Sequence, residues 1–164
     1  RVRCKLVVGR SAELLHQLDI GQLDIAIAMH ALESSNVIAR IIEPMFWLCA
    51  RDGLVTSQAE LPLALLDAPC GFRDVALNAL GVSGRSYWIA ASSSGLAGLR
   101  VAVSSGIAIS VRTLRWAGAD LVVAPKKWQL PKLPQATFSI HVSKNSGDAA
   151  KALATLLAEG LRAV

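Results

Sequence analysis

The stretch that most constrains the fold of this chain is LALLDAPCGFRDVALNAL, residues 63–80. It opens with a short apolar run, which is typical of a strand buried on both faces of a parallel sheet. Residues 67–71 carry the proline and glycine of a tight turn. Apolar residues then recur at helical spacing, and Gly81 is the expected end of the helix. The stretch therefore predicts a strand, a turn and a helix whose free N–H groups lie at the carboxyl edge of the strand.

Arg73 falls in the first turn of this predicted helix. A cation at the positive end of the helix dipole is unfavourable for the helix itself, so Arg73 needs another partner. One interpretation is an anion bound at the helix end, where the N–H groups are free. The other is an ordinary contact with Asp67, Asp74 or water, and the sequence leaves both open.

The 164 residues are 53% hydrophobic, with a mean hydropathy of +0.46. This is enough for one medium domain or two small ones. No apolar run reaches the ~18–20 residues of a membrane span, and the first ten residues lack a secretory hydrophobic region. Cys4, Cys49 and Cys70 are far apart and without metal-ligand spacing. We therefore expect a cytoplasmic protein with reduced thiols and no membrane contact.

Charge is spread unevenly along the chain. The whole chain has a net charge of +5. Its positive charge lies in residues 75–164, which carry 10 basic and only 3 acidic side chains. The cluster Arg112, Arg115, Lys126, Lys127 and Lys132 is interleaved with two tryptophans, as in a loose stacking platform for nucleic acid. It has no RNP-like or glycine-rich organisation, which favours a solvated surface.

The apolar pattern along the chain predicts alternating strands and helices. We expect strands at 2–8, 23–30, 36–42, 45–50, 63–66, 86–91, 107–111, 120–123 and 137–142, with helices between several of them and a last helix after Asn145. The first strand, helix and second strand would form a parallel βαβ unit.

These elements fall into two α/β clusters. We expect one lobe from residues 1–48 and 135–164 and a second from 49–134, joined by two crossovers with a ligand cleft between them.

Motifs for catalysis and for cofactors are weak. His16, His30 and His141 lack metal-ligand spacing, and the chain has no phosphate loop, nucleophile elbow or paired carboxylates. We expect no metal, no cofactor and no enzyme activity. The alternative is a thiol enzyme that would use Cys70 with His30 as its base. Overall the residues favour binding.

Several phrases, taken in order, resemble the effector-binding domain of LysR-type transcriptional regulators. The phrases that carry the resemblance are SAELL at 11–15, LDIGQLDIAI at 18–27, IIEPMFWL at 41–48, LDAPCGFR at 66–73 and LAGLRVAVSSGIAIS at 96–110, with Ser94 before the last. The similarity covers nearly the whole chain.

The resemblance implies a two-lobed fold of the type 2 periplasmic-binding-protein kind, with Rossmann-like lobes. It also implies a cytoplasmic sensor that binds a small, anionic effector between the lobes and pairs as an antiparallel homodimer. Promoter DNA would be bound only through a winged helix-turn-helix, which is absent from this sequence. Arg1 aligns with the family's second strand, so the first strand and helix of lobe one are also expected to be missing. The effector-binding residues that it implies are His30, Pro69, Cys70, Phe72, Arg73, Ser93, Ser110 and Val111.

Within that set, Arg73 would pair with an anionic group and Cys70 would offer backbone N–H groups. The helical spacing makes packing in the core the expected role of Phe72, with a place in the pocket as the alternative. A fragment of a solute-binding protein of the same architecture is the competing function.

Overall fold

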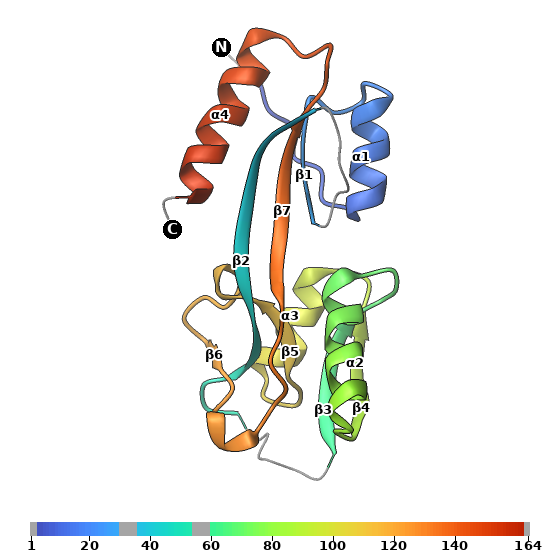
Figure 1. The fold of residues 1–164 in the computed structure, drawn as a ribbon, viewed down its shortest axis with the longest axis vertical. Helices are drawn as coiled ribbons and strands as arrows, with labels where there is room; N and C mark the ends of the chain where they lie inside the picture. Colours follow the sequence, from blue (N-terminus) through green and yellow to red (C-terminus); the bar gives the residue numbers. More distant parts are fainter. Residues whose placement is uncertain (1–2, 30–35, 54–59, 163–164) are drawn as a thin grey trace. The chain divides into compact units, whose positions relative to one another are not determined.

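The computed structural model describes residues 3–29, 36–53 and 60–162. Helices and strands alternate along the chain, as expected of an α/β protein (Figure 1). The chain divides into two compact units, one of Arg1–Glu43 with Ala136–Val164 and one of Pro44–Gln135. The sequence places the lobe boundaries at 48/49 and 134/135. The first division falls earlier because β2 (Val37–Ala50) is one strand that continues through Pro44, where an interruption was expected.

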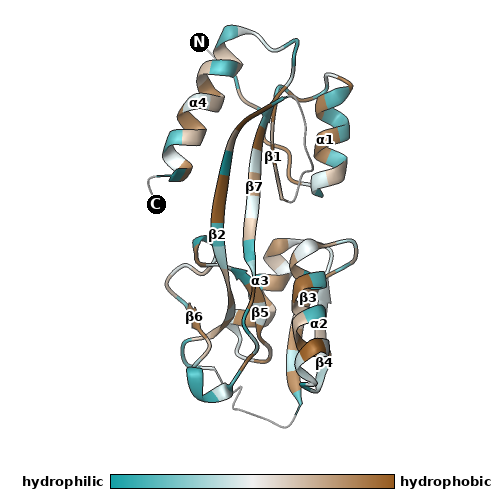
Figure 2. Ribbon diagram, in the orientation of Figure 1, coloured by the Kyte–Doolittle hydropathy of each residue, from teal (hydrophilic) through white to brown (hydrophobic). Residues whose placement is uncertain are grey.

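The first unit is built on the strands β1 (Ile25–Met29), β7 (Gln135–Val142) and β2, with β7 in the middle. β1 and β7 are antiparallel, with Ile25 opposite Val142. The amphipathic helix α4 (Asp148–Arg162) buries Ala154 and Ala158 against the apolar residues of β2 and β7, while hydrophilic residues also lie along it (Figure 2). Burial of this apolar face is what holds the unit together.

The predicted βαβ unit at the N-terminus is wrong. Residues 3–10 form no strand, and Leu6 and Val8 are exposed. Helix α1 (Ser11–Asp19) follows, but β1 then pairs with β7 in the antiparallel sense. Alternating β-branched residues favour a strand only where a neighbouring strand supplies hydrogen bonds, and residues 3–8 have no such partner in the described part of the chain.

The second unit contains the predicted strand, turn and helix. β3 (Leu61–Leu66) leads into α2 (Gly71–Ser83), and β4 (Tyr87–Ser93) returns parallel to β3, with Leu66 opposite Ser93. β3 is buried nearly throughout, as its apolar run predicts. The helix does not end at Gly81: it continues to Ser83 and ends at Gly84, whose φ of +65° is the left-handed conformation that glycine tolerates.

Helix α3 (Leu96–Ser104) and four short elements complete this unit. Strands β5 (Ser110–Thr113) and β6 (Leu121–Val123) both pair antiparallel with β2. The 3-10 turns η1 (Leu114–Trp116) and η2 (Lys126–Trp128) follow β5 and β6. The core includes Leu48 of β2, Ala64 of β3 and Leu99 and Val103 of α3. It fixes β5 beside β3, where Ala64 N donates to Ile109 O at 2.8 Å.

Leu99 and Leu96 provide a matched test of this core, because both lie on α3 and only Leu99 is buried (1% exposed against 43%). We expect Leu99→Ala to lower the free energy of unfolding by about 2–5 kcal/mol through lost burial and a cavity. Leu96→Ala, at an exposed site on the same helix, should cost below ~1 kcal/mol. Urea unfolding measures both, and equal losses would contradict the packing described.

His141 is a buried titratable group in the first unit. It lies opposite Ala26 in the β7–β1 ladder, is fully buried, and neither ring nitrogen has a hydrogen-bond partner within the described residues. Burial lowers the pKa of His141; the charge of Asp19 opposes that shift and the charge of Arg40 adds to it. The imidazole is therefore held in its neutral form.

A lowered pKa in the folded state means that protonation of His141 favours unfolding. Its contribution to stability should be complete above the unfolded-state pKa of about 6.5 and should be lost as the pH falls below that value. When the pH is lowered from 7.5 to 5, the unfolding free energy of the native chain should therefore fall relative to that of His141→Gln. A difference independent of pH would contradict this assignment.

Candidate functional site

The candidate site lies in the second unit, where the N-terminal end of α2 packs against β5. Cys70 is the N-cap residue of α2, with an extended backbone and no side-chain capping bond. The Ala68–Pro69 peptide bond before it is cis, and Pro69 is exposed. The first N–H groups of a helix have no partner within the helix, so this end of α2 can donate to an acceptor.

Arg112 of β5 is the dominant charge of the site. Only 4% of its surface is exposed. Its Nη1 donates to Val111 O at 3.1 Å, whereas Nε and Nη2 are buried and have no hydrogen-bond partner among residues 3–29, 36–53 and 60–162. Burial lowers the pKa of Arg112, and its charge interaction and hydrogen bond with the Cys70 thiol oppose that shift. A guanidinium remains charged in proteins, so the site holds a buried cation.

Two aromatic rings contact this guanidinium. Its carbon Cζ lies 4.5 Å from the ring centroid of Phe72 and 5.7 Å from that of Trp116. These are cation–π contacts, which strengthen when the cation is removed from water. Phe72 is half-buried and contacts Arg112, so neither of the two roles considered for it is excluded.

Ser110 adds a hydroxyl to the same side of β5. Residues two apart on a strand point to the same face, so Ser110 shares a face with Arg112. It is 1% exposed, and its Oγ finds no hydrogen-bond partner in the described part of the chain. The site therefore combines a buried cation, a buried hydroxyl and the start of a helix.

This arrangement fits an oxyanion. Nε and Nη2 form one edge of the guanidinium, and that edge matches the two oxygens of a carboxylate or phosphate. Burying a charge without a partner is costly, and the described residues offer no carboxylate to Arg112. An acceptor from outside the described residues would satisfy these two donors.

The other predicted residues are placed differently. Arg73 has a local partner that the sequence did not suggest: its Nη1 donates to Leu66 O at 3.1 Å, the carbonyl that ends β3. A role of Arg73 in binding an anion stays a prediction. The Ser93 hydroxyl bonds to the backbone of Gly95, at 2.8 Å as donor and 3.2 Å as acceptor. Val111 is fully buried and contributes its carbonyl to Arg112. His30 lies outside the described residues.

Arg112 was not predicted as a site residue. In the sequence it belongs to a cluster of five cations for which a solvated surface was favoured. That interpretation holds for Arg115, Lys126, Lys127 and Lys132, which are exposed, and is wrong for Arg112. A signal was present: Arg112 directly follows the buried run 107–111 and continues its alternation with Ser110.

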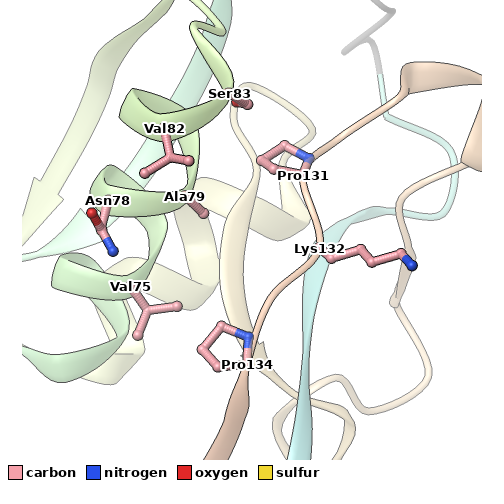
Figure 3. Close-up of a pocket in the computed structure, with 8 residues that line it drawn as sticks. All are labelled: Val75, Asn78, Ala79, Val82, Ser83, Pro131, Lys132 and Pro134. Carbon is pink, nitrogen blue, oxygen red and sulfur yellow. The ribbon is translucent and has the colours of Figure 1, made fainter.

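A separate hollow of about 380 Å³ lies between α2 and the segment 131–134 (Figure 3). Val75, Ala79 and Val82 face Pro131 and Pro134 across it. The side chain of Lys132 extends away from α2 (Figure 3). The walls of this hollow hold no buried charged side chain, so it offers a ligand fewer specific polar contacts than the Arg112 site does.

The described residues hold no group of three or more His, Cys, Asp or Glu that could bind a metal ion. No helix in residues 3–29, 36–53 and 60–162 is long and apolar enough to cross a membrane.

Two curated transcription regulators are similar in sequence. The HTH-type transcriptional regulator PecT of Dickeya dadantii (strain 3937) is 30% identical over 131 residues, covering 80% of this chain and 42% of PecT. The HTH-type transcriptional regulator DgdR of Burkholderia cepacia is 32% identical over 163 residues, covering 98% of this chain and 53% of DgdR. The chain thus spans about half the length of these relatives.

Solved structures show the same fold. The apo-form regulatory domain of HypT from Salmonella typhimurium matches with a TM-score of 0.70 at 16% identity, covering 94% of this chain and 80% of that one. The reduced regulatory domain of OxyR from Pseudomonas aeruginosa matches with a TM-score of 0.62 at 23% identity, covering 94% and 78%. Both support the predicted type 2 periplasmic-binding-protein-like fold.

The model of the LysR substrate binding domain matches residues 1–162, essentially the whole chain. The resemblance found in the sequence is confirmed, and this chain belongs to the LysR substrate-binding domain family.

Proposed function

We propose that this chain is the effector-sensing domain of a bacterial LysR-type regulator and that its effector is a small carboxylate or phosphate. In this proposal it acts in the cytoplasm as a homodimer, and its two compact units are the two lobes of the family. Effector binding would alter how an attached winged helix-turn-helix engages a promoter. Membership of the family and the names of the curated relatives support this role over that of a solute-binding protein.

The observation that carries the proposal is the free edge of Arg112. Its Nε and Nη2 are buried without a partner in the described chain, beside the Ser110 hydroxyl and the start of α2. Charge-assisted, two-point hydrogen bonds are stronger and more directional than neutral ones. An acceptor with two oxygens in one plane is therefore favoured over a neutral or cationic ligand.

The same geometry suggests how binding would be transmitted. Arg112 and Ser110 lie on β5, whereas Cys70 and Phe72 belong to the start of α2. An oxyanion that accepts hydrogen bonds from both elements would tie α2 to β5. A ligand shifts a conformational equilibrium only through different affinities for the two states. The state in which α2 and β5 lie close would be the one favoured.

Ligand classes can be compared by thermal unfolding of the 164-residue chain. Succinate, benzoate and inorganic phosphate are the acidic probes, and succinamide and benzamide are the matched neutral controls. At least one acid should raise the midpoint and its amide should not, because a ligand at 100 times its Kd stabilises by about 2.7 kcal/mol. Arg112→Gln should abolish the shift and Ser110→Ala should reduce it.

Arg73→Gln is the control variant, because its guanidinium already bonds to Leu66 O. It should keep the response. Loss of the response in Arg73→Gln with retention in Arg112→Gln would move the site back to the position expected from sequence. No response to any acid at millimolar concentration would contradict an oxyanion effector of this size.

Arg112 should also behave as a binding residue in stability measurements. Replacing a buried, incompletely paired charge by an apolar side chain of similar length is often neutral or stabilising. We expect Arg112→Met to leave the free energy of unfolding unchanged or to raise it by about 1 kcal/mol while removing the response to acids. A loss above ~2 kcal/mol in urea unfolding would instead assign Arg112 to a structural network.

A further inference from the structure

Trp116 links the Arg112 site to a second cation on α3. Its ring centroid lies 5.7 Å from Arg112 Cζ and 5.5 Å from Arg100 Cζ. Trp116 ends η1, the short turn that directly follows β5. The half-buried ring therefore contacts the buried guanidinium of the site and a more exposed guanidinium outside it.

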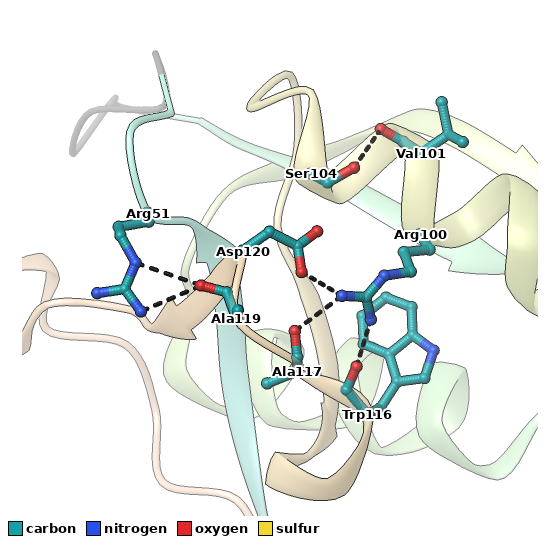
Figure 4. Close-up of polar contacts among 8 residues, drawn as sticks. All are labelled: Arg51, Arg100, Val101, Ser104, Trp116, Ala117, Ala119 and Asp120. Carbon is teal, nitrogen blue, oxygen red and sulfur yellow. Dashed lines mark hydrogen bonds and ion pairs between the residues drawn. The ribbon is translucent and has the colours of Figure 1, made fainter.

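Arg100 fixes the backbone that carries this ring (Figure 4). Its Nη1 donates to Trp116 O at 2.6 Å, and its Nη2 donates to Ala117 O at 3.0 Å and forms an ion pair with Asp120. The loop is shaped around this guanidinium: Gly118 has a φ of +60°, and a Cβ there would lie 2.6 Å from Arg100 Nη2. The Arg100 side chain thus contacts the loop at three positions, Trp116, Ala117 and Asp120.

We propose that Trp116, clamped by Arg100 and Asp120, is a positioning residue that holds the free edge of Arg112 ready for an oxyanion. Nη1 of Arg112 donates to the carbonyl of its neighbour Val111, and the guanidinium also interacts with the Cys70 thiol and the two rings, so these contacts set its terminal rotamer. A guanidinium held flat against a ring can donate only in its own plane. Ordering it before binding reduces the entropy lost when the ligand binds.

The clamp can be tested without any ligand, by NMR of the Arg112 Nε–H group. In the native chain this proton should be shifted by the ring currents of Phe72 and Trp116 and should exchange slowly because it is buried. Trp116→Leu and Arg100→Gln should both move the signal toward the ordinary arginine position and speed its exchange. Trp116→Phe, which keeps a ring, should retain most of the shift.

Arg51 supplies the matched control. Its guanidinium also donates to this loop, at Ala119 O with distances of 3.2 Å and 3.4 Å (Figure 4), but within the described residues it has no cation–π contact with a ring. Arg51→Gln should leave the Arg112 signal unchanged. If Trp116→Leu and Arg100→Gln also leave it unchanged while circular dichroism shows a folded chain, the positioning role is wrong.

The link to binding rests on the proposed function and is measured separately with inorganic phosphate. Trp116→Leu should weaken phosphate binding about tenfold and Trp116→Phe by less than ~3-fold, since the charge remains and only its ordering is lost. The native chain could bind neither phosphate nor carboxylate while Trp116→Leu still alters the Arg112 signal. That result would overturn the proposed function but would support the positioning role of Trp116. Unchanged affinity in Trp116→Leu would overturn the positioning role.

Discussion

A buried positive charge is the constraint around which the second unit is arranged. Arg112 lies in a strand whose four residues are all buried, and it receives one backbone carbonyl, a thiol and two aromatic rings as neighbours. Rings and a thiol stabilise a cation less than a carboxylate does. Residues 3–29, 36–53 and 60–162 thus hold this charge without a carboxylate to neutralise it, and an added anion interacts strongly with a charge in that condition.

The topology explains why this charge lies beside a helix end. A parallel β3–α2–β4 unit places the start of α2 at the carboxyl edge of β3. The backbone bond from Ala64 to Ile109 holds the chain leading into β5 alongside β3. Side chains of β5 and the first turn of α2 then meet near the carboxyl end of β3, although β5 belongs to the sheet of β2. The order of the strands determines where the site lies, and Arg112 of β5 gives the site its charge.

Local patterns predicted what local forces decide. The apolar run 63–66, the turn and the apolar spacing of α2 were found in the sequence because a buried strand and an amphipathic helix each carry their own periodicity, although β3 begins two residues earlier, at Leu61. Residues 3–8 had the pattern of a strand but lack a neighbour to pair with. Arg73 and Arg112 could not be ranked by pattern. Arg73 follows a turn and Arg112 follows an apolar run. Only the tertiary packing shows that Arg73 donates to Leu66 O and that Arg112 is enclosed.

In the proposed function, Arg112 and Arg100 of the second unit have different roles: Arg112 would provide affinity for the effector, and Arg100 would order the site. Arg112 supplies charge at the site, whereas Arg100 uses its charge on Asp120 and two carbonyls of the loop that carries Trp116. A lysine in place of Arg112 would keep the charge but present a rotating point donor without a flat face for the rings. Discrimination between planar oxyanions and simple anions would then weaken even if attraction persisted. In the proposed function, selectivity would therefore depend on a planar guanidinium in contact with two rings as well as on positive charge.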